Sequence, residues 1–362
     1  MSDQKYNDEF FEQYAQKYIP SEKTPPIKIV EDNPPPKKKK KKGRGFAAFL
    51  AVILVLAVAA GTVFVLSLFD KVDIKSDLSG ENTDAPVESV PEVKLFKLFS
   101  DENTRILTTE IRSEYAVLVD AKTGRIVAQK SADTVIYPAS MTKVLTLLTA
   151  VEMIENLEDT YTVKFDDIHP GYVEGASMAG FAENEVVTIK DLLYGTVLPS
   201  GADATAALAS YLTGSESAFA PYMNQKAKEL GIETANFVNT SGLHNANHYC
   251  TVKDIAIIMK AAMDNPICKE ILSTYQYTTS ITPEHPEGIL LTSTLFSRMY
   301  GTEPEVATIT AGKTGFTNEA GNCIVSYGVS VTGNEYIFVT SKAAGAWPSV
   351  FDHINTYKNF TE

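Results

Sequence analysis

A serine and a lysine lie three residues apart at the start of a strongly apolar segment. Ser140 and Lys143 belong to the stretch YPASMTKVLTLLTAVEMI, residues 137–154, in which apolar residues cover most faces of the expected helix. Residues three apart share one face of a helix, and burial disfavours the charged form of a lysine. The pair therefore predicts a serine nucleophile beside an amine that serves as its base. A helix-capping serine and a lysine reaching to water would fit the same spacing.

Two later segments carry groups that suit the same chemistry. Ser200 lies in the turn Pro-Ser-Gly at 199–201, where it either caps the next helix or aims a second hydroxyl at the first serine. Lys313, Thr314 and Gly315 come before strand-like sequence. A lysine and a threonine hydroxyl can hold a carboxylate, and glycine leaves room for a substrate along the strand. Taken alone, the K-T-G segment also fits a surface turn.

The elements that would position these residues alternate between strands and helices. Residues 115–129 and 322–343 predict hairpins, because apolar and β-branched runs flank short turns. Helices are expected from near 140 and over 189–195, 202–212, 217–231, 252–265 and 348–360. Strands that pair as hairpins, with helices between them, predict an α+β fold.

The three motifs together resemble those of the penicillin-recognising serine enzymes. S-x-x-K at 140–143 is followed by the Ser-Gly turn 60 residues later and by K-T-G a further 113 residues on. The chain looks more specifically like the D-alanyl-D-alanine carboxypeptidases, the low-molecular-weight penicillin-binding proteins. The similarity runs from about Ile106 to Tyr357 and includes VLVDAKTGRIVAQKSAD, YPASMTKVLT, DLLYGTVLPSGADA, NTSGLHNANHYCTVKDIA and GKTGFTNEAGNCIV.

This resemblance implies a fold and an activity. The fold would be a five-stranded antiparallel sheet packed with helices, with a helical subdomain across a cleft. The activity would be removal of the terminal D-alanine from peptidoglycan stem peptides ending in D-Ala-D-Ala, through an acyl-enzyme and without a cofactor or metal. β-Lactam antibiotics would bind the same site. A same-superfamily endopeptidase or β-lactamase, and a non-catalytic penicillin-sensing or wall-binding protein, are the alternatives.

The resemblance also assigns roles residue by residue. Ser140 would be the acylated nucleophile, Lys143 its base, and Ser200 the relay of a proton toward the leaving amine. The strand residues would bind substrate: Lys313 and Thr314 through its carboxylate, and Phe316, next to Gly315, through a backbone N–H that forms the oxyanion hole with that of Ser140.

One position departs from the family pattern, and one cluster invites a different interpretation. The family's second motif is S-x-N, but here it is Ser200-Gly201-Ala202, without the amide that helps orient the lysine in relatives. His244, His248 and Cys250 lie within seven residues, as zinc ligands can. The Asn-rich segment around them predicts no regular helix, so we expect loop or packing residues rather than a metal site.

The first hundred residues have a different organisation. Residues 1–45 hold 11 Lys/Arg against 7 Asp/Glu and end in a polybasic run, which predicts a disordered cytoplasmic tail. Residues 46–69 contain no charge and are long enough to span a bilayer. The basic flank places the N-terminus inside the cell. A cleaved signal peptide is the alternative. Residues 70–104 are expected to form an extracytoplasmic linker.

The catalytic domain is then expected over 105–362, outside a bacterial cell membrane that the chain crosses once. Residues 46–362 carry a net charge of −17 within a total of −13, which argues against nucleic-acid binding. The chain has only three cysteines, too few and of the wrong parity for a disulfide framework. The stability of the domain must therefore come from an ordinary core.

Overall fold

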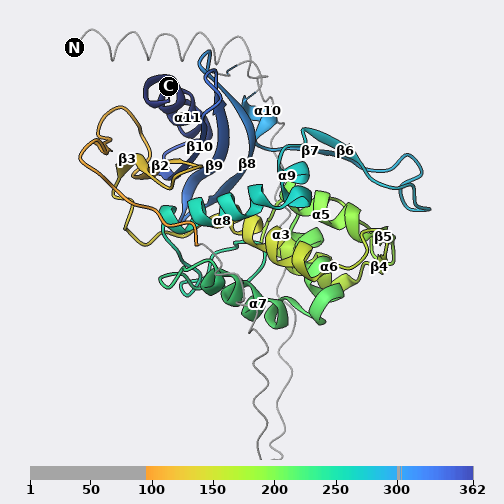
Figure 1. Ribbon diagram of the computed structural model, residues 1–362. Helices are drawn as coiled ribbons and strands as arrows, with labels where there is room; N and C mark the ends of the chain where they lie inside the picture. Colours follow the sequence, from red (N-terminus) through yellow and green to blue (C-terminus); the bar gives the residue numbers. More distant parts are fainter. Residues whose placement is uncertain (1–94, 300–301, 303, 362) are drawn as a thin grey trace, which may run out of the picture. The chain divides into compact units, whose positions relative to one another are not determined.

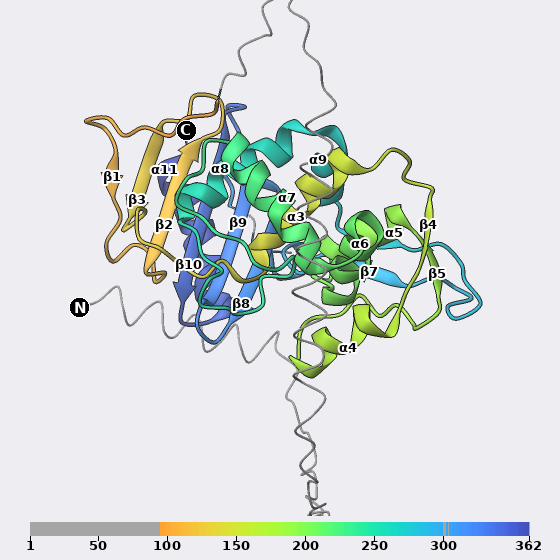
Figure 2. The same cartoon turned by 90° about the horizontal axis from the view of Figure 1, so that it is seen from below.

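A mixed six-stranded sheet organises the part of the chain that this computed structural model describes, residues 95–299, 302 and 304–361. Its strands are adjacent in the order β1-β3-β2-β10-β9-β8, as Figure 2 shows from β1 at one edge to β8 at the other. Their bounds are Arg105–Ile106 for β1, Tyr115–Asp120 for β2, Ile126–Lys130 for β3, Ala307–Thr317 for β8, Gly321–Ser330 for β9 and Glu335–Ala343 for β10. β8 is thus an edge strand.

The α+β class is confirmed, but the expectation of a purely antiparallel five-stranded sheet is wrong. Five strands pair antiparallel, and the two-residue strand β1 adds a sixth that runs parallel to β3, with Arg105 opposite Ala128. A strand of two residues has no period in the sequence, so its pairing could not be predicted.

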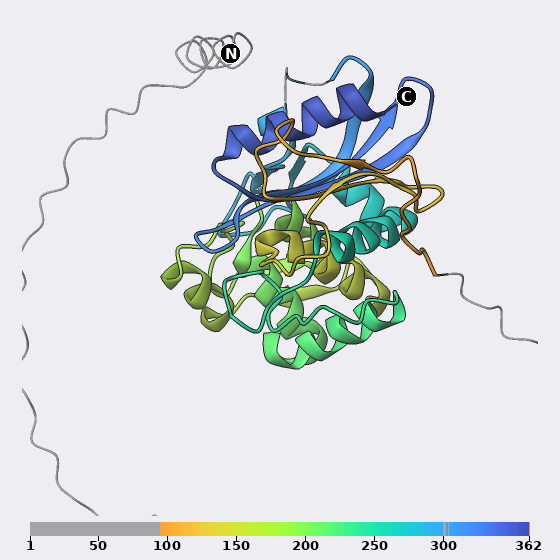
Figure 3. The same cartoon turned by 90° about the vertical axis from the view of Figure 1, so that its left-hand side faces the viewer.

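Both faces of the sheet are covered, because alternate side chains of each strand enter different layers. Leu118 of β2 and Phe338 of β10 are opposite one another and belong to a buried cluster with Tyr357 of α11, Ala346–Phe360. Val119 and Ile337, the next opposed pair, belong to the larger cluster that includes the other helices. Figure 3 shows α11 on one side of the sheet and α8 on the other.

The helices on the second face form the larger half of the core. The central helix α3, Thr142–Met153, is buried over ten of its twelve residues, as its apolar sequence predicts. In Figure 1 the helices α5, α6 and α7 surround it below the sheet. The bounds are Phe165–Val173 for α4, Ile189–Val197 for α5, Ala202–Thr213 for α6, Glu216–Glu229 for α7, Val252–Asp264 for α8, Pro266–Leu272 for α9 and Phe296–Met299 for α10. The predicted helices are therefore confirmed to within about two residues.

Local sequence signals fix where several of these helices begin. Thr188 caps α5 and Thr251 caps α8. Each hydroxyl accepts from the backbone N–H of an aspartate three residues on, and the side chain of that aspartate accepts from the backbone N–H of the threonine. Two small antiparallel pairs complete the fold: β4, Thr160–Thr162, with β5, Val186–Thr188, and β6, Gln276–Thr278, with β7, Leu290–Thr292.

The segment before β1 lies against the body. Phe96 and Leu98 pack on the core, and the N–H of Ile126 donates to the carbonyl of Phe99 at 2.7 Å. Sequence analysis placed residues 95–104 in the linker. The predicted tail 1–45, the predicted span 46–69 and linker residues 70–94 lie outside the described residues. In the described part of the chain, no helix is long and apolar enough to cross a membrane.

Candidate active site

Ser140 is presented by a short, strained connection into the central helix. It lies in a 3-10 turn, Ala139–Met141, directly before α3. Ala139 has a φ of 47°, a backbone conformation that residues other than glycine rarely adopt. The carbonyl of Ala139 approaches Gly242 so closely that an added Cβ would lie 1.9 Å from its oxygen. A glycine at 242 is therefore needed for the turn to sit against the segment that follows α7.

The amine of Lys143 lies beside the hydroxyl of Ser140. Lys143 Nζ is 3.1 Å from Ser140 Oγ and donates to the backbone carbonyl of Ser241 at 2.7 Å. Burial lowers the pKa of Lys143 to about 7, although the nearby carboxylates of Glu216 and Asp203 oppose that shift. The amine is therefore available in its neutral form near neutral pH, when Ser140 can donate its proton to it.

Ser200 contributes a third polar group from the turn before α6. Its φ is 67°, and it is 5% exposed. Such a backbone conformation is costly for serine and recurs at functional sites. Ala202, in the position of the family's asparagine, is the first residue of α6 and is also buried. The adjacent Asp203 accepts from the N–H groups of Ala179 and Gly180 at 2.8 and 2.9 Å, which fixes the loop beside Ser200.

The K-T-G motif lies inside edge strand β8, whereas the sequence suggested that it comes before a strand. The main chain of β8 passes directly over the nucleophile, because a Cβ on Gly315 would lie 2.9 Å from the backbone nitrogen of Ser140. In this structure the glycine therefore serves the approach of the strand to Ser140. Thr314 Oγ1 is 2.7 Å from Thr294 Oγ1, and the exposed Phe316 follows at the pocket rim.

A lysine and an arginine lie at the Thr314 side of the site. Lys313 is buried and donates to the carbonyl of Thr314 at 2.9 Å. Burial lowers its pKa, and the charges of Lys143 and Arg298 lower it further. Arg298, from α10, is half-buried and lines the pocket itself. A substrate carboxylate placed here would meet positive charge and two threonine hydroxyls.

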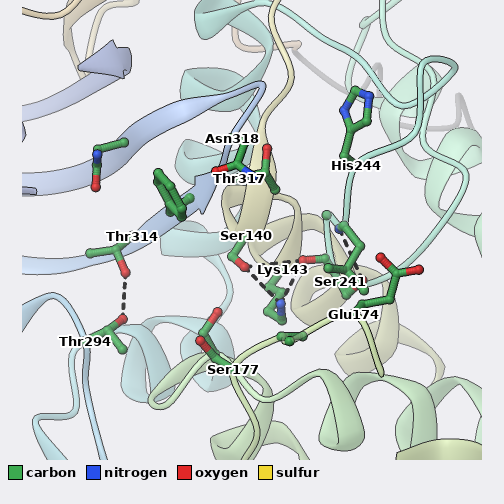
Figure 4. Close-up of a pocket in the computed structure, with 18 of the residues that line it drawn as sticks. Ser140, Lys143, Glu174, Ser177, Ser241, His244, Thr294, Thr314, Thr317 and Asn318 are labelled. Atoms are coloured by element: carbon green, nitrogen blue, oxygen red, sulfur yellow. Dashed lines mark hydrogen bonds between the residues drawn. The ribbon is translucent and has the colours of Figure 1, made fainter. Parts of the chain in front are cut away.

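These residues surround one pocket of about 780 Å³. It is lined by Ser140, Lys143, Ser200, Thr314, Gly315 and Phe316, so six of the seven residues singled out in the sequence share it, and Lys313 lies buried beside Thr314. Figure 4 shows Ser140 and Lys143 at its centre, Thr294 and Thr314 on one side, and Glu174 and His244 on the other. The pocket thus has a cationic and hydroxyl-bearing side across the nucleophile from a side that carries a carboxylate and an imidazole.

Two groups at the site belong to no motif of the sequence. The Ser241 carbonyl belongs to the backbone, which no motif reveals, although the Ser-Gly dipeptide at 241–242 does indicate a turn. Arg298 belongs to a four-residue helix without a sequence signal of its own.

The histidines of the segment 244–250 have separate places in the structure. His248 is buried, accepts from the N–H of Val238 at Nδ1, and lies 2.8 Å from Thr142 Oγ1 at Nε2. Burial lowers its pKa to about 4, and the charge of Lys143 adds to the effect. His244 lines the pocket and faces Glu319 at 3.8 Å, while Cys250 is buried. His248 therefore contacts the first residue of α3, Thr142.

A buried lysine whose pKa is lowered to about 7 lies next to a serine, below an edge strand that carries a second lysine and a threonine. This arrangement is typical of serine acyl-transfer sites of the S-x-x-K type. The sequence model of the family described as D-alanyl-D-alanine carboxypeptidase matches residues 101–343. The chain belongs to this family.

Individual relatives agree with that assignment. The chain is 32% identical over 229 residues to the D-alanyl-D-alanine carboxypeptidase DacF of Bacillus subtilis, covering 62% of this chain and 56% of that one. It is 32% identical over 151 residues to DacC of Escherichia coli, covering 40% and 38%. The chain therefore spans just over half of the first relative and less than two fifths of the second.

The fold is likewise shared with solved structures. The DD-transpeptidase of a Streptomyces strain superposes with a TM-score of 0.60 at 26% identity, over 68% of this chain and 95% of that one. A D-alanyl-D-alanine carboxypeptidase from Mycobacterium tuberculosis, at 23% identity, shows the same fold with a TM-score of 0.60, over 68% and 90%.

Proposed function

We propose that this protein is a serine D-Ala-D-Ala carboxypeptidase that removes the terminal D-alanine of peptidoglycan stem peptides. The observation that carries the proposal is the 3.1 Å contact between Ser140 Oγ and an amine whose pKa burial lowers to about 7. A hydroxyl is a weak nucleophile by itself, and a neutral amine at hydrogen-bond distance is the base that activates it.

In the acylation step, Ser140 Oγ attacks the carbonyl carbon between the two D-alanines as its proton passes to Lys143 Nζ. The new bond joins Oγ to that carbon, and the C–N bond to the terminal D-alanine breaks. Ser200, which lines the same pocket, relays the proton from Lys143 to the departing amine. Water then attacks the acyl carbon while Lys143 accepts a proton from it. The Oγ–C bond breaks, Lys143 returns the proton to Ser140 Oγ, and the shortened peptide leaves.

The developing oxyanion is bound by the backbone N–H groups of Ser140 and Phe316. What supports this is the close approach of β8 at Gly315 to the backbone nitrogen of Ser140, which brings the main chains of nucleophile and strand side by side. Removal of one such donor costs about 3 kcal/mol of transition-state stabilisation in other enzymes.

The free carboxylate of the substrate is bound on the Thr314 side. Thr314, Arg298 and the buried Lys313 supply hydroxyl and positive charge there, within reach of a group one residue beyond the scissile bond. β-Lactams, which carry a carboxylate in a comparable place, would acylate Ser140 by the same route.

The catalytic domain is extracytoplasmic and tethered by residues 46–69 as a single membrane span, with residues 1–45 in the cytoplasm. The uninterrupted apolar run behind a basic flank supports this arrangement. Intact-mass measurement of protein from bacterial membranes tests it, because a mature N-terminus near Gly61 would mean that the segment is a cleaved signal.

The activity itself is tested with the domain beyond the predicted span, a D-Ala-D-Ala peptide and a cross-linked peptide dimer. Release of D-alanine from the peptide is expected. Cleavage of the dimer alone would favour an endopeptidase, and rapid turnover of penicillin without D-alanine release would favour a β-lactamase. Absence of any reaction or adduct would favour a non-catalytic protein.

A further inference from the structure

Lys143 is oriented in this chain by a backbone carbonyl. Its Nζ donates to Ser241 O at 2.7 Å, and that contact is shorter than the one to Ser140. The asparagine that helps to orient this lysine in relatives is Ala202 here. A separate cavity of about 230 Å³ is lined by Ala202, Ser241 and Glu216, among others. Ala202 thus borders a cavity, while the lysine has another acceptor.

The Ser241 carbonyl can serve this purpose only if its segment is held in place, and the preceding residue is held from two sides. Glu216, the first residue of α7, accepts from the N–H of Thr240 at 2.9 Å and from its hydroxyl in a very short hydrogen bond. On the other side, Thr146 of α3 donates to the Thr240 carbonyl at 2.7 Å. Thr240 is fully buried, and loss of a hydrogen bond at a buried group is costly.

We propose that Glu216 is a positioning residue for Lys143: it fixes Thr240, so that the adjoining Ser241 carbonyl takes over the orienting role of the asparagine that Ala202 lacks. The inference rests on the proposed function, in which Lys143 is the base. It explains how the family's second motif can lose its amide while Ser140, Lys143, Ser200 and Lys313 remain.

The charge of Glu216 acts on the same amine. Four charged or titratable groups influence or adjoin Lys143 from the surrounding elements: Asp203 from α6, Glu216 from α7, Lys313 from β8 and His248 from the segment before α8. Of these, Glu216 is the stronger of the two carboxylates that raise the pKa of Lys143 against burial. Loss of the carboxylate charge should therefore make the amine less basic, even where the hydrogen bonds to Thr240 survive.

The test compares E216A and E216Q with wild type in covalent acylation by penicillin, followed by intact-mass spectrometry between pH 5 and 9. E216A loses the tie to Thr240 and should acylate at least tenfold more slowly above pH 8. E216Q keeps an amide oxygen for the Thr240 N–H and should stay within about threefold of wild type there. Its rise of rate with pH should have a lower midpoint, because the negative charge is gone.

E229Q is the matched control, since Glu229 ends the same helix and pairs with Lys226 at 2.7 Å, half-exposed. It should match wild type in rate and midpoint. The inference is overturned if E216A acylates as fast as wild type, if folded E216Q is as slow as E216A, or if the midpoint of E216Q does not fall. Melting temperatures show which variants fold. A wild type that forms no adduct at all would instead refute the proposed function.

Discussion

Acylation of Ser140 should depend on pH through Lys143, and the structure gives the midpoint. Burial lowers the pKa of this amine from 10.5 to about 7. Because the base must be neutral to accept a proton, the reaction is lost as pH falls through that value. The neutral fraction is about 9% at pH 6 and about 91% at pH 8, so the acylation rate should rise roughly tenfold between them. A lysine with an ordinary pKa would be neutral only about once in three thousand at pH 7.

The assay is stopped-flow or rapid-quench measurement of penicillin acylation by the domain beyond the predicted span, with melting temperatures recorded at every pH. His244 also lines the pocket and is an ionisable side chain. H244Q therefore serves as the control and should keep the midpoint near 7. A rate that is flat from pH 6 to 8, or that rises only above pH 9, would refute the assignment of Lys143 as a neutral base. If the rate of H244Q no longer rises between pH 6 and 8, the pH dependence would be assigned to the histidine.

Three further variants test other parts of the site. S140A should abolish covalent labelling and leave the melting temperature nearly unchanged, because among the described residues Ser140 Oγ contacts Lys143 and, at a long 3.4 Å, Ser241 O. Residual labelling would place the nucleophile elsewhere. R298A should lower kcat/KM for a D-Ala-D-Ala peptide about tenfold, because loss of a charge-assisted contact has an effect of that size. It should leave kcat/KM for the C-terminally amidated peptide unchanged. Equal losses on both peptides would exclude a role of Arg298 in carboxylate binding. A202N should raise kcat/KM by less than about tenfold, because Lys143 already donates to Ser241; a hundredfold gain would mean that the alanine is a defect.

Much of the scaffold could be predicted because its signals are local. The apolar run after Ser140 predicted a buried helix, and α3 is buried over nearly its whole length. The hairpins β2–β3 and β9–β10 follow from alternating runs around short turns. Strand β1 could not be predicted, because two residues show no periodicity. Its pairing also depends on residues 95–104, which run along Arg125 and Ile126.

The site was predictable to the extent that its chemistry resides in side chains. Ser140, Lys143, Ser200 and Thr314 could be singled out by type and spacing, and they share one pocket. The acceptor for Lys143 could not be predicted, because it is the backbone carbonyl of Ser241. The neighbouring Thr240 is bound by the carboxylate of Glu216, 24 residues before Thr240. Burial is the main cause of the lowered pKa of Lys143, as the apolar sequence around this lysine suggested.

The central claim is that Ser140 forms the acyl-enzyme from which D-alanine has been released. The most direct test incubates the domain beyond the predicted span with a D-Ala-D-Ala peptide at pH 8, quenches it in acid within the first turnover, and maps the modified peptide by mass spectrometry. The account predicts an adduct equal to the substrate minus one D-alanine, on Ser140, with free D-alanine in equal amount. An adduct on another residue, or D-alanine release that persists in S140A, would contradict it.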